Sequence, residues 1–144
     1  MRRLVAVLVV SIVSLCAAPA IAAAPKHGYY IDPKLQVYVV VNASRTALSS
    51  FQAPCMVKDT TSGALSQSGG FLLKTKHPKL SPSGSFSYSG NVTLQSDRKS
   101  VVKVTFTGAF AGGKIKGKIT LDTTKTGCEP YSYAGKYYGV NPQG

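Results

Sequence analysis

Alternating hydrophobic and polar positions dominate the chain from residue 28 to residue 138. The clearest case is residues 100–122, where two alternating segments flank the pair Gly112-Gly113. Apolar residues or glycine occupy every second position over 102–110 and again over 115–121. A period of two on both sides of a glycine turn predicts an antiparallel hairpin with one apolar face and one polar, lysine-rich face.

Six further segments have strand character and are bounded by Gly, Pro, Asn or Ser. They are residues 28–31, 35–41, 46–57, 71–76, 84–89 and 131–138, with a brief strand at 92–94. The polar stretches 58–70 and 77–83 are interpreted as loops. Pro54 predicts a bulge or an edge in the third strand, because proline cannot donate to a ladder.

The fold class predicted from this pattern is all-β and antiparallel, with about eight strands. No window of 11 or more residues after residue 24 has a helical period, so we expect essentially no helix there. A small closed β-barrel is favoured over a β-sandwich, because closure removes exposed edge strands. In a closed barrel the first and last strands would be neighbours.

The N-terminus predicts an export signal. Arg2 and Arg3 precede an apolar run at residues 4–15, which is too short to span a bilayer, and Ala20-Ile21-Ala22 fits a cleavage site. We therefore expect a bacterial signal-peptide helix at 1–22 and a single domain at 23–144, secreted or associated with the cell envelope, with no transmembrane span. A lipid anchor on Cys16 and an uncleaved signal anchor are the alternatives.

Charge and cysteine count describe the expected mature chain further. Removing Arg2 and Arg3 leaves 15 basic and five acidic residues, a net charge of +10. Two cysteines remain, Cys55 and Cys128, and an even number in an exported chain indicates a disulfide. Two free thiols are the alternative.

Glycine and cysteine spacing over residues 28–138 resembles a group of small secreted β-domains of the actinobacterial type whose role is not established. The resemblance implies a disulfide-bonded β-fold and no catalytic residues. The matching positions are Gly28, Tyr30, Cys55, Phe86-Ser87, the segment 107–113, Gly117 and Cys128.

Sites for catalysis, metal or nucleotide are poorly supported, so we expect a non-enzymatic protein with no cofactor. The histidines and cysteines lack short ligand spacing, and no Gly-x-Ser-x-Gly motif occurs. The run Gly108 to Lys114 imitates a P-loop but continues into a strand, with Ile115 where Ser or Thr would hold magnesium, which indicates a hairpin turn. All the acidic residues that remain after the signal lie in predicted turns, loops or strand ends: Asp32, Asp59, Asp97, Asp122 and Glu129.

Lysines on the polar side of the hairpin are the first functional candidate. Like charges on neighbouring strands repel, so the arrangement does not serve stability. It would attract an anionic cell-wall polymer, lipid headgroups or nucleic acid, although solubility and edge protection would also explain it. The predicted cationic face consists of Lys103, Lys114, Lys116 and Lys118, with Lys125 nearby.

Tyrosines near both ends of the domain are the second candidate. They could form an exposed aromatic platform or, alternatively, cap the barrel core. A ligand-carrying barrel of the lipocalin kind and a secreted enzyme inhibitor that uses the loop 58–70 are the alternative functions. The possible platform residues are Tyr29, Tyr30, Tyr131, Tyr133, Tyr137 and Tyr138.

Overall fold

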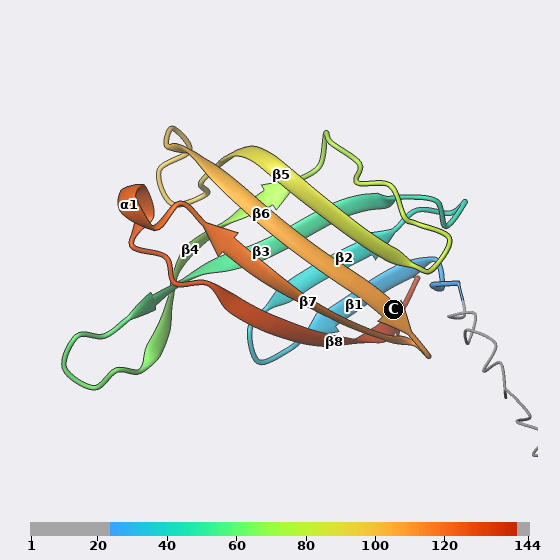
Figure 1. The fold of residues 1–144 in the computed structure, drawn as a ribbon, viewed down its shortest axis with the longest axis horizontal. Coiled ribbons are helices and arrows are strands. Elements are labelled where there is room, and N and C mark those ends of the chain that lie inside the picture. The colour runs from blue at the N-terminus through green and yellow to red at the C-terminus, as the bar shows by residue number, and fades with distance from the viewer. Residues whose placement is uncertain (1–23, 141–144) are drawn as a thin grey trace, which may run out of the picture.

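A computed structural model describes residues 24–140 and shows an all-β fold (Figure 1). The predicted signal peptide at 1–22 lies outside the described residues. One antiparallel sheet curls into a nearly closed, flattened barrel, which confirms the predicted fold class. Its strands are β1 (Gly28–Asp32), β2 (Val37–Val41), β3 (Leu48–Lys58), β4 (Leu65–Leu73), β5 (Ser85–Thr93), β6 (Val101–Ala111), β7 (Lys114–Leu121) and β8 (Tyr131–Gly139).

Two four-stranded meanders build the sheet, whose strand order is β4-β3-β2-β1-β8-β7-β6-β5. They meet where β1 pairs with β8, as expected for neighbouring first and last strands. The edge strands β4 and β5 then approach each other at a seam. An isolated bridge joins Phe71 to Leu94 there, and the Gln95 N–H donates to the Gly70 carbonyl at 2.8 Å.

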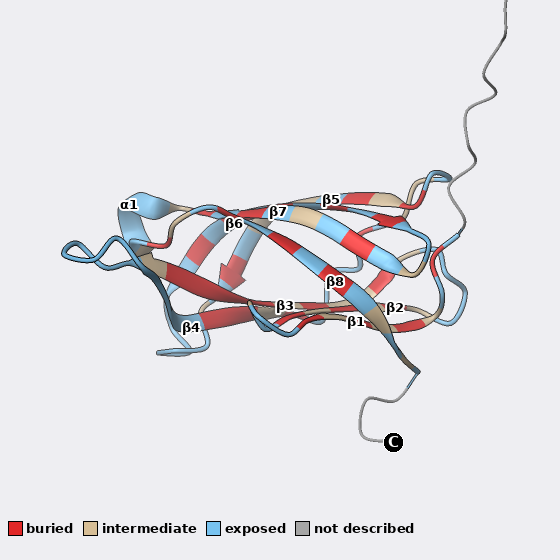
Figure 2. Ribbon diagram, turned by 90° about the horizontal axis from the view of Figure 1, so that it is seen from below, coloured by how far each residue is buried: buried red, intermediate tan, exposed pale blue. Residues whose placement is uncertain are grey.

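Inward side chains fill the barrel because buried and exposed residues alternate along the strands (Figure 2). In β6 every second residue from Val102 to Phe110 is buried. The rings of Phe51 and Phe106 stack with their centroids 3.9 Å apart. Phe71 and Tyr133 also pack against the Phe51 ring.

Strand β4 begins earlier than the sequence pattern predicts. The segment 58–70 is not one loop, because Leu65 pairs with Lys58 and Gln67 pairs with Met56. These residues form the β3–β4 arm (residues 56–67), which projects from one end of the barrel (Figure 1). Residues 65–69 are exposed, so this part of the strand has no buried face and no hydrophobic alternation.

A single helical turn, α1 (Thr123–Thr126), follows β7. The side chain of Asp122 caps it by accepting the Thr124 N–H, and Gly127 ends it at φ 65°. Such short polar turns lack the apolar periodicity on which helix prediction depends. Within residues 24–140, no helix is long and apolar enough to cross a membrane.

The predicted disulfide between Cys55 and Cys128 is present, with the two Cα atoms 5.2 Å apart. Cys55 lies in a bulge of β3, where the pairing with β4 shifts between Pro54 and Met56, as Pro54 predicted. Beside it, the Glu129 N–H donates to the Met56 carbonyl at 2.7 Å. The disulfide therefore fastens the connection between β7 and β8 to β3.

Candidate functional site: a lysine strip beside a groove

Strand β7 presents Lys114, Lys116 and Lys118 on the outside of the barrel, because the alternate residues Ile115 and Ile119 point into the core. In register, Lys118 lies between Thr107 of β6 and Ser132 of β8, and Lys116 lies between two alanines. None of these cross-strand partners is acidic. Strands β5 to β8 contain no acidic residue at all.

Lys136 of β8 lies directly opposite Lys114. Side chains at opposite positions of an antiparallel pair have Cβ atoms about 5 Å apart, so two like charges there are destabilising. Lys136 is not among the lysines predicted to form the cationic face. The alternation of the last strand indicates that it faces outward, but its position beside Lys114 depends on the β7–β8 register. We call Lys114, Lys116, Lys118 and Lys136 the lysine strip.

Lys103 and Lys125 are exposed but lie at the other end of the barrel face. The Asp122 N–H donates to the Lys103 carbonyl, so Lys103 is level with Asp122, four residues or about 13 Å along β7 from Lys118. The Thr124 hydroxyl lowers the pKa of Asp122 by hydrogen bonding, and the positive charge of Lys125 lowers it further. The five predicted lysines thus do not form one cluster.

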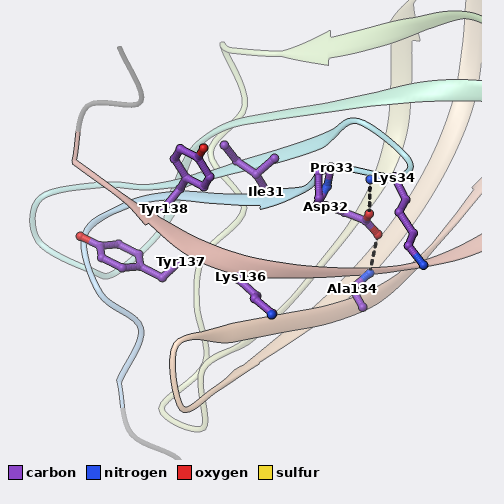
Figure 3. Close-up of a pocket in the computed structure, with 8 residues that line it drawn as sticks. All are labelled: Ile31, Asp32, Pro33, Lys34, Ala134, Lys136, Tyr137 and Tyr138. Atoms are coloured by element: carbon purple, nitrogen blue, oxygen red, sulfur yellow. Dashed lines mark hydrogen bonds between the residues drawn. The ribbon is translucent and has the colours of Figure 1, made fainter. Parts of the chain in front are cut away.

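A groove of about 490 Å³ adjoins the lysine strip on the outer side of β1 and β8 (Figure 3). Tyr138 lies beside Ile31 at one end of this β1–β8 groove, and Lys34 lies at the other (Figure 3). Lys136 belongs to both the groove and the lysine strip. The lining residues are Ile31, Asp32, Pro33, Lys34, Ala134, Lys136, Tyr137 and Tyr138.

Asp32 sits in this groove, but backbone N–H groups engage its carboxylate. Oδ1 accepts from Lys34 at 3.0 Å and Leu35 at 3.2 Å, and Oδ2 accepts from Ala134 at 2.9 Å. Only 6% of the residue is exposed. Asp32 therefore holds the β1–β2 turn against β8, which indicates a structural carboxylate.

The six tyrosines do not form one exposed platform, because Tyr30, Tyr131 and Tyr133 are buried. The Tyr131 hydroxyl donates to the Pro54 carbonyl at 2.7 Å, and the Tyr133 hydroxyl donates to the Thr107 carbonyl at 3.0 Å. The alternative interpretation, in which the rings cap the core, describes these three.

Tyr29 and Tyr137 are half-buried, and the Tyr137 hydroxyl donates to the His27 carbonyl at 2.9 Å. Tyr138 is 67% exposed. It is the extra residue of a bulge, because Tyr29 pairs with Gly139 and Tyr30 with Tyr137. The bulge turns the Tyr138 ring outward into the groove.

The acidic residues of the described turns are held by their own segments. Asp97 accepts the Ser100 hydroxyl and the Lys99 N–H, which lower its pKa to about 2. Asp59 accepts the Ser62 N–H and hydroxyl and the Thr61 N–H, and its pKa is also lowered. Residues 24–140 contain no group of three or more potential metal ligands. The Gly112-Gly113 segment is the β6–β7 hairpin turn, as the sequence predicted.

Comparison with models of protein families gave no match, and comparisons with curated proteins and with solved structures gave none either. The resemblance to secreted actinobacterial-type β-domains stays a hypothesis.

Proposed function

We propose that this protein is an exported, non-enzymatic β-domain that associates with the cell envelope through the lysine strip. The observation that carries the proposal is the directly opposed pair Lys114 and Lys136, with no acidic residue in strands β5 to β8. A sheet gains stability when one member of such a pair is neutral or acidic. Two lysines at this position are better explained by an anionic partner.

A linear anionic polymer fits the spacing of the strip. Alternate residues of a strand lie about 7 Å apart, so Lys114 to Lys118 covers about 13 Å in a line. Repeated phosphate or carboxylate groups along a cell-wall polymer can contact such a row at several points. The net charge of the expected mature chain, +10, adds long-range attraction for the same partner.

The barrel interior gives less support to a ligand carrier of the lipocalin kind, because stacked Phe51 and Phe106 occupy its centre. One observation favours an inhibitor as the second candidate. The β3–β4 arm projects from the barrel (Figure 1), and a projecting segment is what a protease or glycosidase inhibitor inserts into its target. Replacing residues 60–63 with a two-residue turn should abolish inhibition of the target while leaving the barrel folded.

The test of the principal proposal is retention of the mature protein on purified anionic cell walls. A variant with Lys→Gln at 114, 116, 118 and 136 is compared with one carrying Lys→Gln at 58, 99, 103 and 125. Both lose four charges, and all eight side chains are exposed. We expect the first variant to lose retention and the second to keep most of it.

Salt provides the second measurement. Retention of the native protein should fall steeply between 50 and 200 mM salt, because the polymer releases counterions on binding. Equal losses in the two variants would show that net charge alone matters and would contradict a defined strip. Binding to anionic lipid vesicles but not to cell walls would replace the polymer with a membrane surface.

A further inference from the structure

A second groove, of about 260 Å³, lies on the outside of β3 and β4 beside the seam. It brings together four of the five glutamines of the chain, from four separate parts of the fold. No charged residue lines it. We call it the glutamine groove, and its lining residues are Gln36, Gln52, Ala53, Pro54, Gln67, Gly69, Gly70 and Gln95.

Topology alone assembles these amides. Gln36 belongs to the β1–β2 turn, Gln52 to β3 and Gln67 to β4. Gln95 follows β5 and reaches the groove because its own N–H closes the seam to Gly70. Gln36, Gln67 and Gln95 are exposed, and Gln52 is half-buried. Four amides are thus available to a ligand.

Residues with small or no side chains form the base of the groove. A Cβ atom on Gly70 would lie 2.6 Å from the Ala53 carbonyl oxygen, so only glycine fits there. Gly70 pairs with Pro54, and both residues are buried. The base is therefore formed by buried residues, and the glutamine amides lie around it.

Carboxamides define the chemistry that this groove can recognise. Each glutamine offers two N–H donors and one carbonyl acceptor without a net charge. Neutral sugars present hydroxyl groups that both donate and accept hydrogen bonds. We propose that the glutamine groove binds neutral sugar units of a glycan.

A peptide is the less suitable occupant. A peptide that bound by strand addition would need free backbone groups along the edge of β4. At this edge the Gly70 carbonyl already accepts a hydrogen bond from the Gln95 N–H. The groove also lacks a deep apolar pocket for a peptide side chain, since its lining is mainly amide and glycine.

The β1–β2 turn connects this groove to the β1–β8 groove, because Pro33 and Lys34 line one and Gln36 lines the other. A glycan with both charged and neutral units could therefore contact both grooves. The binding of neutral sugar itself does not depend on the lysine strip or on the function proposed for it.

Titration of the ¹⁵N-labelled exported protein with maltohexaose, cellohexaose and chitohexaose tests this proposal. At 0.5 M NaCl we expect at least one of them to bind with a millimolar or lower Kd. It should shift the side-chain amide signals of the four glutamines. Gln52→Ala with Gln67→Ala should raise the Kd about tenfold, which corresponds to the loss of one or two hydrogen bonds.

Three controls make the outcome decisive. Asn91→Ala removes an exposed amide of β5, away from the groove, and should leave the Kd unchanged. Gln67→Glu keeps the side-chain shape but removes the donors, and should weaken binding in a protein of native stability. The Lys→Gln variant at 114, 116, 118 and 136 should bind the neutral sugar normally, so this test can fail or succeed independently of the function proposed above.

Failure of the native protein to bind any of the three sugars at 5 mM would overturn the proposal. So would an unchanged Kd in the Gln52→Ala, Gln67→Ala variant. Shifts of the same amide signals by an uncharged Gly-Ser peptide, without shifts by sugar, would replace the glycan with a peptide.

Discussion

Asp32 shows how one side chain can join two parts of the barrel. Its carboxylate accepts two N–H groups of the β1–β2 turn and one of β8. The sequence predicts that Asp32 lies in a turn or at a strand end, and an aspartate before proline can bond its own backbone there. The third bond was not predictable, since Ala134 is 102 residues away.

Asp32→Ala should lower the free energy of unfolding by about 3 kcal/mol, because three backbone donors lose a charged acceptor. Asp32→Asn keeps one acceptor oxygen and should cost about half as much. Urea unfolding at pH 7 measures both. Equal stability of the alanine variant and the native protein would contradict the structural role of this carboxylate.

Tyr131 and Tyr133 predict how stability depends on alkaline pH. Burial raises the pKa of both hydroxyls well above 10, and the charge of Asp32 adds to the effect on Tyr131. In the unfolded chain tyrosine loses its proton near pH 10. Above that pH the unfolded state binds fewer protons than the folded state, so stability falls as pH rises.

Above pH 10, each of these tyrosines should lower the free energy of unfolding by about 1.4 kcal/mol per pH unit, until the pH reaches its pKa in the folded state. Below pH 10 both hydroxyls are protonated in the folded and unfolded states, so their full contribution to stability is present. A Tyr131→Phe, Tyr133→Phe variant should therefore show a shallower decrease between pH 10 and 11.5 in urea unfolding. Parallel curves for the variant and the native protein would contradict this prediction.

Individual strands were predictable where one face is buried. In β6 and β7 the alternation is complete, and the predicted hairpin is present with its turn at Gly112-Gly113. Only the β4 half of the β3–β4 arm was missed. Residues 65–69 are exposed on both faces, so hydrogen bonding rather than burial makes them a strand. Hydrophobic patterns detect only the first kind of strand.

The like-charge pair between β7 and β8 yields a prediction of opposite effects on stability and binding. Lys136→Glu would place a carboxylate opposite Lys114 and should raise the free energy of unfolding by about 0.5 kcal/mol. The same change should reduce retention on anionic cell walls. Thermal unfolding and the cell-wall assay measure the two effects.

Lys103→Glu is the matched control for this prediction, because Lys103 lies opposite Asn91 and level with Asp122. The control should not stabilise the barrel and should retain most of the binding. A loss of stability in Lys136→Glu would contradict the repulsion assigned to the pair. A similar gain in Lys103→Glu would show that lower net charge, rather than this pair, is responsible.

The whole barrel is closed by contacts between residues far apart in sequence. The strand number and the pairing of β1 with β8 followed from the alternation and from the need to close the sheet. The candidate site was less predictable. Lys136 joins Lys114 only through the β7–β8 register, and the glutamine groove assembles four residues that share no local pattern.

The disulfide stabilises this closed arrangement across 73 residues of sequence. Loop-closure entropy assigns it about 4 kcal/mol. Cys55→Ser with Cys128→Ser should lower the free energy of unfolding by about that amount in urea. Addition of dithiothreitol to the native protein should produce a similar loss, whereas the variant should not respond to it.

The position of β8 also governs when the barrel can form. This last described strand lies in the middle of the sheet, where it joins the β1–β4 half to the β5–β7 half. During synthesis, a chain that has not yet reached residue 131 has no strand to connect the halves. A nascent chain therefore cannot complete the sheet until β8 has also been synthesised.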